Sequence, residues 1–270
     1  MTLNIVVYRP ADPDLYIDTA DLPDPFSINI PLCITNNESI TLYFKAVLVN
    51  PPADYTVTEA TLGSVGAGSS ACFVATFRRY KPSLVDGEYQ ETVTLRVEAY
   101  TDDAYTDLYG YIDIDITIVF IDHTDPAWSV VDIDNFDQGS EEGWAITEKT
   151  IDAAFEDTCW ILDIKSDHYI SSPYSLGCDG EASPPRIIYK DFDLSAYSKA
   201  FIVIHIYRVD DFALAIGDQL VIPRAISRLL PSSKWIRLVH KLPTGTTVRV
   251  AFHFSLNSGN RLDDIIVIAK

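Results

Sequence analysis

Short runs in which apolar and polar residues alternate one by one constrain the fold of this 270-residue chain more than any other feature. In residues 28–34 every second side chain is apolar, and in residues 112–118 four Ile alternate with Asp113, Asp115 and Thr117. A two-residue period places alternate side chains on opposite faces of a β-strand, so each run has one buried and one solvated face. Fifteen Pro and twelve Gly help to separate these runs. We therefore predict an all-β chain.

The length predicts two domains, because 270 residues exceed the usual size of one. Residues 1–122 contain seven or so short strands with turns between them, which is the pattern of a β-sandwich. Residues 123–127 are the expected linker, since the residue before Pro126 is held extended. Residues 128–270 are expected to form a second β domain, with one or two helical turns within residues 223–230.

The first domain contains the turn Leu62-Gly63-Ser64-Val65-Gly66-Ala67-Gly68, followed by a strand around Phe73. In this respect it resembles the immunoglobulin-like modules of surface proteins. It departs from true immunoglobulin domains because it contains no Trp and because its Cys pair does not fit their usual bridge between sheets. The resemblance implies an immunoglobulin-like β-sandwich for residues 1–122.

The second domain opens with the sequence Val-Asp-Ile-Asp-Asn-Phe-Asp at residues 131–137 and closes with Leu-Asp-Asp-Ile-Ile-Val-Ile at residues 262–268. Between them lie Gly143-Trp144, Cys159-Trp160-Ile161-Leu162, Ser171-Ser172-Pro173-Tyr174-Ser175-Leu176 and Lys190-Asp191-Phe192-Asp193-Leu194-Ser195. This frame resembles the β jelly rolls of carbohydrate-binding modules and galactose-binding-like domains. The resemblance implies a C-terminal jelly roll that binds or builds and does not catalyse.

In the jelly rolls that this domain is similar to, the first and last strands are adjacent, and acidic residues there often hold a structural calcium ion. That similarity implies a calcium site formed by Asp134, Asp137, Asp263 and Asp264, because calcium is bound by six to eight oxygen ligands. The alternative is that these carboxylates cap turns and face water. Calcium is the only cofactor expected.

A sugar site in such folds usually combines a stacking aromatic ring with polar groups on one sheet or its edge. Alternation places His205 and Tyr207 on one face of their strand, and Arg249 and His253 on one face of theirs. If the two strands share a sheet, these four residues form one ligand-binding surface; the alternative is an ordinary solvated face. The residues Trp144, Trp160 and Trp235 are expected to serve packing.

The four cysteines divide equally between the domains, which favours the disulfides Cys33–Cys72 and Cys159–Cys178 over the two other pairings. Alternation supports the first bridge, because Cys33 and Cys72 both point away from the apolar face of their strands. Four reduced, buried thiols are the alternative. Disulfides would fit an oxidising exterior or the interior of a hyperthermophile.

The formal charge of −19 argues against nucleic acid and against anionic membranes, since both require an excess of Lys and Arg. No apolar run is long enough to span a membrane. The N-terminus reads as a strand and not as a signal peptide, so synthesis in the cytoplasm is expected. No motif of a nucleophile, a metalloprotease or a phosphate loop is found, and we expect no enzyme activity.

These features lead to three hypotheses of function. The first is a surface-displayed structural protein, such as a virion turret, spike or decoration protein, of a thermophile virus given one Met and three Gln. Its partners would be other subunits of the assembly or a cell-surface glycan or receptor. The second is a carbohydrate-binding accessory module of an extracellular polysaccharide-active enzyme or adhesin. The third, a glycosidase or lyase on a jelly roll, has no visible site.

Overall fold

The computed structural model describes residues 4–8, 14–136, 139–140, 142–149, 151–153, 161–166, 170, 175–179, 186–255 and 259–270. The regular secondary structure of these residues is β-strand, apart from one short helix, α1 (Arg224–Ser227), which lies inside the segment predicted to be helical. The prediction of an all-β protein is confirmed. The chain divides into two compact units, Met1–Asp122 and His123–Lys270, and each is described by itself. No helix of the described part is long and apolar enough to cross a membrane.

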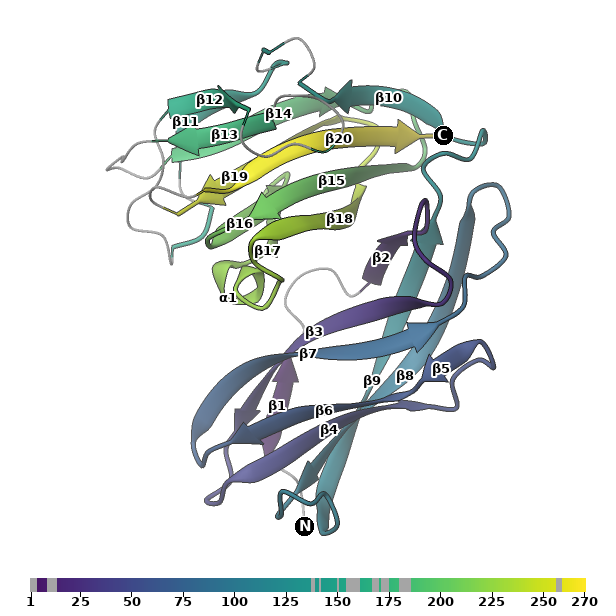
Figure 1. Cartoon of the computed structure of the whole chain (residues 1–270), viewed down its shortest axis with the longest axis vertical. Helices are drawn as coiled ribbons and strands as arrows, with labels where there is room; N and C mark the ends of the chain where they lie inside the picture. Colours follow the sequence, from purple (N-terminus) through teal and green to yellow (C-terminus); the bar gives the residue numbers. More distant parts are fainter. Residues whose placement is uncertain are drawn as a thin grey trace. The chain divides into compact units, whose positions relative to one another are not determined.

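The N-terminal unit is a sandwich of two sheets (Figure 1). One sheet has the order β1-β3-β7-β5, and the other β2-β9-β8-β4-β6. All described pairs are antiparallel except β2 with β9, which is parallel. The bounds are β1 (Ile5–Tyr8), β2 (Asp14–Asp18), β3 (Phe26–Asn36), β4 (Leu42–Val49), β5 (Tyr55–Val57), β6 (Glu59–Val65), β7 (Ser69–Arg79), β8 (Glu88–Tyr100) and β9 (Leu108–Ile121).

This strand order is that of an immunoglobulin-like sandwich. If β1 and β2 are counted as a split first strand and β5 and β6 as a split fourth strand, one sheet holds strands one, two, five and four, and the other holds strands three, six and seven. The alternation predicted from the sequence is present, because Ile28, Ile30, Leu32 and Ile34 of β3 are all buried. They form the core together with the inward residues of β4, β7, β8 and β9.

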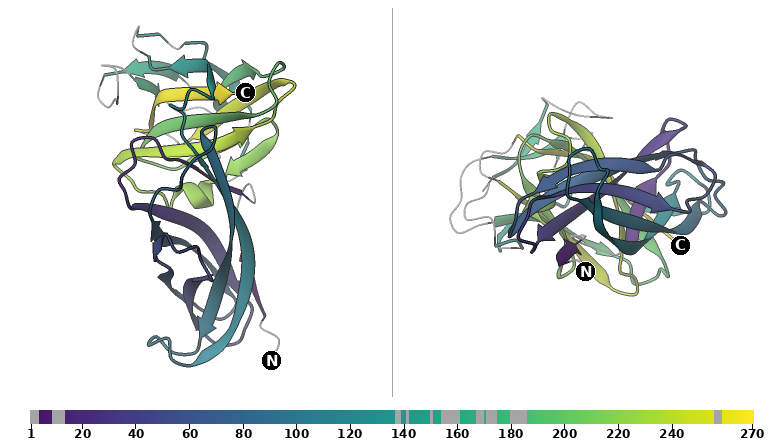
Figure 2. Two further views of the ribbon diagram at one scale, coloured as in Figure 1. Left: turned by 90° about the vertical axis from the view of Figure 1, so that its right-hand side faces the viewer. Right: turned by 90° about the horizontal axis from the view of Figure 1, so that it is seen from below.

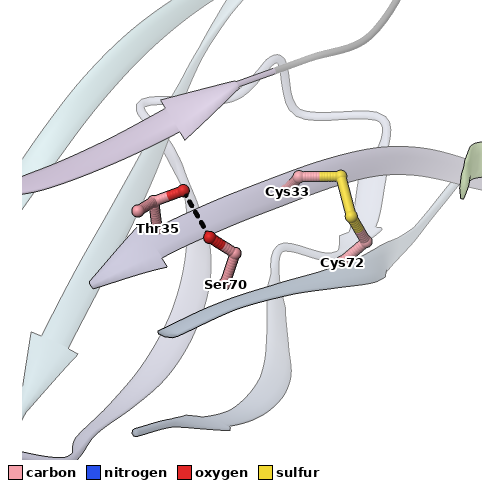
Figure 3. The surroundings of a disulfide bond; sticks show 4 residues. All are labelled: Cys33, Thr35, Ser70 and Cys72. Atoms are coloured by element: carbon pink, nitrogen blue, oxygen red, sulfur yellow. Dashed lines mark hydrogen bonds between the residues drawn. A yellow bond between two sulfur atoms is a disulfide. The ribbon is translucent and has the colours of Figure 1, made fainter. Parts of the chain in front are cut away.

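Cys33 and Cys72 form a disulfide, as predicted (Figure 3). The two residues are direct partners in the register of β3 and β7, so the bridge joins neighbouring strands of one sheet. Thr35 and Ser70 lie on the same face, each two residues from a cysteine of the bridge. Their hydroxyl oxygens are 2.8 Å apart, and Figure 3 shows this contact beside the bridge. Cys159 and the side chain of Cys178 lie outside the described residues, so the second disulfide stays a prediction.

Arg79, at the end of β7, carries a buried charge between the two sheets and is only 1% exposed. It forms ion pairs with Asp54 and with Glu91 of β8. Its guanidinium carbon lies 4.6 Å from the centre of the Phe120 ring of β9 and 4.9 Å from that of Tyr55. Because these partners come from both sheets, Arg79 ties the sheets together at one end of the unit.

Tyr55 completes this buried network. Its hydroxyl donates a hydrogen bond of 2.6 Å to Glu91 Oε1, the oxygen that also accepts from Arg79. Burial, together with this bond to a carboxylate, raises the pKa of Tyr55 above its usual value. The phenol therefore stays protonated and serves as a donor to Glu91.

The C-terminal unit is also a sandwich of two antiparallel sheets (Figures 1 and 2). The first sheet has the order β12-β13-β20-β15-β18, with β10 also paired to β20, and the second has the order β11-β14-β19-β16-β17. The bounds are β10 (Ser129–Asp134), β11 (Ala145–Glu148), β12 (Ile161–Lys165), β13 (Ser175–Asp179), β14 (Arg186–Asp193), β15 (Ala200–Arg208), β16 (Phe212–Ile216), β17 (Gln219–Ile222), β18 (Lys234–Leu242), β19 (Thr247–Phe254) and β20 (Arg261–Ala269).

The first and last strands of this unit are neighbours, as the jelly-roll resemblance implied: β10 pairs with β20 from Ser129↔Ala269 to Asp134↔Ile265. The core lies between the sheets and contains Ile202, Ile204 and Ile206 of β15 opposite apolar side chains of β19. Trp144 is buried there against Phe192 and Phe252, which confirms its predicted packing role.

β20 contains a bulge at Asp264, whose φ is +43°. Along β15, His205 and Val203 are two residues apart, but their partners Asp263 and Ile266 are three apart. The extra residue lets both Leu262 and Ile265 face the core, while Asp263 projects from the opposite, outer face. The Asp263-Asp264 pair therefore lies at the point where β20 changes which of its alternate residues face the core.

Removal of the Arg79 charge should destabilise the N-terminal unit strongly. We expect Arg79→Ala to lower the free energy of unfolding by about 3–5 kcal/mol, because Glu91 would remain buried without its counter-ion. Arg96→Ala is the matched control, since Arg96 and Asp113 pair on a solvated face and should contribute about 1 kcal/mol or less. Urea titrations of both variants measure this, and equal losses would contradict the proposed role of Arg79.

Reduction of the Cys33–Cys72 bridge should lower the free energy of unfolding by about 2–4 kcal/mol. The bridge closes a loop of 39 residues, so its loss increases the conformational freedom of the unfolded chain. Urea titration of the paired variant Cys33→Ser/Cys72→Ser, compared with the oxidised wild type in the absence of reductant, measures the effect without changing the other cysteines. A variant as stable as the oxidised wild type would show that the bridge does not stabilise the fold.

Candidate functional site

The four residues predicted to form one ligand-binding surface lie in two different sheets. His205 and Tyr207 are on β15 in the first sheet, whereas Arg249 and His253 are on β19 in the second. The expectation of one shared surface is therefore wrong. The parity within each strand was predicted correctly, but β19 pairs with β14 and β16 and not with β15.

On the second sheet, Arg249 and His253 have structural surroundings. Arg249 donates two hydrogen bonds of 2.7 Å to Asp191, and its guanidinium lies 3.9 Å from the centre of the Tyr189 ring. His253 is fully buried, and this burial lowers its pKa to about 4. Arg249 thus belongs to a solvated ladder of polar side chains, and His253 is an uncharged interior residue at neutral pH.

The outer face of the first sheet brings together a different set of residues. Direct partners in the antiparallel register share a face, and one row across the strands reads Gly177, Arg261, Tyr207 and Trp235. The next row on the same face reads Asp263, His205 and Arg237. We call the group of His205, Tyr207, Trp235, Arg237 and Arg261 the aromatic–arginine face.

Two aromatic rings lie side by side on this face. Tyr207 and Trp235 are partners across β15 and β18, with ring centres 5.6 Å apart and ring planes at 63°. Both side chains are half-buried, in contrast to the buried Ile206 between the two rows. Side chains of this kind combine a large apolar surface with a polar tip, so they can receive a ligand that has both characters.

His205 holds Arg237 in position. Arg237 Nε donates to His205 Nε2 at 2.9 Å, and His205 Nδ1 lies 3.0 Å from the carbonyl oxygen of Asp264. These two contacts are both satisfied when Nδ1 carries the proton and Nε2 accepts, so the geometry assigns the Nδ1–H tautomer. The Arg237 side chain is half-exposed.

Arg261 lies flat along the sheet because the neighbouring position is a glycine. A Cβ atom at Gly177 would come within 3.1 Å of Arg261 Cδ and 2.9 Å of Lys165 Cγ. Arg261 Nη1 also donates to the carbonyl of Asn260 at 3.0 Å. The missing side chain at Gly177 thus provides the space in which two cationic side chains cross the face.

Sequence reasoning missed Trp235, Arg237 and Arg261. Trp235 was expected to serve packing, but it lies on the outer face beside Tyr207. In β18 every second residue from Trp235 to Lys241 lies on one face. This alternation could have identified Trp235 and Arg237 from the sequence. Trp160, expected to serve packing as well, lies outside the described residues.

The residues predicted to bind calcium do not come together. Asp134 projects into the core, where it accepts a hydrogen bond of 3.0 Å from Trp144 Nε1 and forms an ion pair with Lys190. Lys190 also lies 2.9 Å from Asp132. Asp263 projects from the opposite face of the same sheet, so Asp134 and Asp263 cannot be ligands of one ion in this geometry.

The remaining predicted ligands do not restore such a site. Asp263 accepts hydrogen bonds from the amides of Ile170 at 2.6 Å and Asp264 at 2.9 Å. Asp264 is the bulge residue, and Asp137 lies outside the described residues. Within the part of the chain that the structure describes, no three His, Cys, Asp or Glu side chains are grouped so that they could hold a metal ion.

Comparisons with known proteins find solved structures of low sequence identity and low TM-score. No family model matches this chain. No curated protein matches it either. A xylan-binding domain, CBM22-1 of Xyn10C from Paenibacillus barcinonensis, is 11% identical, with 53% of this chain and 96% of that chain covered and a TM-score of 0.37. The K3 cleaved adhesin domain of Lys-gingipain from Porphyromonas gingivalis is 13% identical, with coverages of 53% and 99% and a TM-score of 0.36.

These two neighbours are an adhesin domain and a xylan-binding domain, and both TM-scores are below 0.5. A likeness at this level carries no inference about this chain. Any function has to be argued from the aromatic–arginine face itself.

The Asp134–Lys190 pair should make stability depend on pH. Burial raises the pKa of Asp134 to about 6, although Lys190 and Trp144 favour its charged form. The folded protein then holds this proton more tightly than the unfolded chain, whose aspartates titrate near pH 4. Asp134 therefore contributes most to the free energy of unfolding below pH 4. This contribution falls by about 2–3 kcal/mol in total as pH rises to 6.

Urea titrations between pH 4 and 7 of the wild type and Asp134→Asn test this dependence. The difference in the free energy of unfolding between them should shift in favour of the variant as pH rises from 4 to 6. A shift in the opposite direction would mean that Lys190 outweighs burial and lowers the pKa of Asp134.

Proposed function

We propose that this chain is a non-catalytic glycan-binding protein that acts at an extracellular surface, and that its aromatic–arginine face receives the sugar. The observation that carries the proposal is the pair Tyr207 and Trp235, adjacent on an outer sheet face with Arg237 and Arg261 beside them. It corresponds to the hypothesis of an accessory module of a polysaccharide-active enzyme or adhesin.

The chemistry of this face suits a sugar ring. The C–H side of a pyranose is apolar and packs against an aromatic ring, while its hydroxyl groups need hydrogen-bond partners. Tyr207 and Trp235 supply the rings, and the polar side chain of Arg237, which His205 holds in place, lies one row away on the same face. Neighbouring strands are roughly 5 Å apart and successive residues on one face are roughly 7 Å apart, which is the scale of one sugar unit.

Binding without turnover is the simpler reading of this face. Hydrolysis of a glycosidic bond needs two carboxyl groups placed about 5–10 Å apart on either side of that bond. The groups gathered around Tyr207 and Trp235 are aromatic and cationic, and Asp263 is engaged by two backbone amides. Such groups orient a ligand and carry no proton-transfer pair.

The hypothesis of a virion surface component stays a prediction. No observation on the described residues favours it over glycan binding. A display role would require self-association or a place in an assembly, and light scattering of the full chain would reveal it.

Loss of either ring should weaken glycan binding at least tenfold, because a stacking contact of about 1.4 kcal/mol corresponds to that factor. The variants are Trp235→Ala and Tyr207→Ala, and the measurement is affinity electrophoresis and calorimetry against neutral and acidic polysaccharides. The matched control is Tyr189→Ala, a half-buried aromatic on the second sheet.

The expected result is loss in the first two variants with unchanged melting temperatures, and wild-type affinity in Tyr189→Ala. Glycan binding that all three variants retain would place the site elsewhere. No binding of the wild type to any polysaccharide would reject the proposed function.

A further inference from the structure

We propose that Lys190 and Asp134 condense to an amide between Lys190 Nζ and Asp134 Cγ, which joins the two sheets of the C-terminal unit covalently. The three groups that this reaction needs meet between the sheets: an amine, a buried carboxyl group and a second carboxylate, that of Asp132. The inference concerns a modification of the chain itself and does not depend on glycan binding.

The amine and the buried carboxyl group come from opposite sheets. Asp134 ends β10, the first strand of this unit, and is buried. Lys190 lies in β14 of the second sheet, where alternation places it on the same face as the buried Ile188 and Phe192. Lys190 Nζ contacts Asp134 Oδ1. The two side chains thus meet across the core, although they are 56 residues apart in the sequence.

Little water reaches this contact. The Asp134 side chain is 2% exposed and the Lys190 side chain 12%. The centre of the Phe192 ring lies 5.5 Å from Lys190 Nζ, and a Cβ atom at Gly143 would lie 4.0 Å from the same nitrogen. In water, the hydration of an ammonium and a carboxylate opposes their condensation. Burial removes that hydration, whereas an amide carries no charge, so these surroundings favour the amide over the ion pair.

The carboxyl group of Asp134 is prepared for attack. Burial raises its pKa to about 6, so the neutral acid, which is the form that an amine attacks, is easier to reach than in an ordinary aspartate. Trp144 Nε1 donates to Asp134 Oδ2 at 3.0 Å, where it stabilises negative charge that develops on this oxygen. Two groups fixed in contact react as if one were present at about 10⁵–10⁸ M.

Asp132 is the base in this reaction. Burial favours the neutral amine of Lys190, but its hydrogen bonds to Asp134 and Asp132 outweigh burial and raise its pKa. The amine therefore starts as an ammonium and has to lose a proton before it attacks. Asp132 Oδ2 lies 2.9 Å from Lys190 Nζ, which is within reach for accepting that proton.

The atoms and charges of the reaction balance without a further reagent. Asp132 takes one proton from the ammonium and passes it to Asp134 Oδ1, which gives the amine and the neutral acid. The lone pair of Lys190 Nζ then bonds to Cγ, and the C=O electron pair moves onto Oδ2. When that pair forms the C=O bond again, the bond from Cγ to Oδ1 breaks, and Oδ1 leaves as water with a second proton from Nζ. Asp134 no longer titrates in the product, so the pH dependence described above belongs to the unreacted ion pair.

A second lysine–carboxylate contact lacks these features and provides an internal control. Lys45 Nζ lies 2.5 Å from Glu59 Oε2, but the two side chains are 26% and 55% exposed. Both ions keep their hydration, so this contact should remain an ion pair.

The test is the mass of the full chain, denatured and with its disulfides reduced. We expect a species lighter than the calculated mass by one water molecule. Digestion should then yield a branched peptide in which Lys190 is joined to Asp134, and none in which Lys45 is joined to Glu59. Lys190→Met cannot form the bond and should keep the full mass. The matched control Lys45→Met should lose water as the wild type does.

Asp132→Asn tests the base, because it keeps both reacting groups in place. It should lose water about a hundredfold more slowly than the wild type, as expected for removal of a general base. Equal rates in the two proteins would overturn the role of Asp132. Wild-type protein that keeps its full mass after prolonged incubation would overturn the bond. Loss of water without the branched peptide would also overturn it, because a cyclic imide at another aspartate has the same mass.

Discussion

The C-terminal unit depends on the position of β20 inside its sheet. That strand is hydrogen-bonded to β15 along one edge, and to β13 and β10 in succession along the other. A strand paired on both edges has only two faces left for its side chains, so each residue must serve either the core or the outer surface. The bulge at Asp264 resolves the conflict between Leu262 and Ile265, which both have to face inward although they are three residues apart. Arg261 and Asp263 consequently reach the face that carries Tyr207.

Features that depend on a single strand were predictable from the sequence. The buried set of β3 follows from its alternation, and the separation of His205 and Tyr207 from Ile204 and Ile206 follows from that of β15. The Cys33–Cys72 bridge was predictable for the same reason, because outward parity on neighbouring strands leaves only the register to be decided. In each case the relevant information lies within a few residues.

Features that depend on which strands are neighbours were not predictable in this way. Alternation describes β19 as well as it describes β15, but it contains nothing about the partner that each strand chooses, so Arg249 and His253 were assigned to the wrong surface. Asp134 shows the same limit. Its acidic neighbours suggested a calcium ligand, whereas its real partner is Lys190, which is 56 residues away in the sequence. The contact of Trp235 with Tyr207 likewise depends on the pairing of β18 with β15, which alternation does not predict.

Arg79 gives the N-terminal unit an uncommon dependence on temperature. Its ion pairs with Asp54 and Glu91 close one end of the sandwich with charge, where another fold would use apolar side chains. The cost of removing charged groups from water falls on heating, because their hydration has a strongly negative entropy, whereas hydrophobic stabilisation per unit area reaches a plateau. The net contribution of this buried network therefore grows as the temperature rises. It supports the two sheets best under the hot conditions at which apolar packing alone no longer compensates for the conformational entropy of the chain.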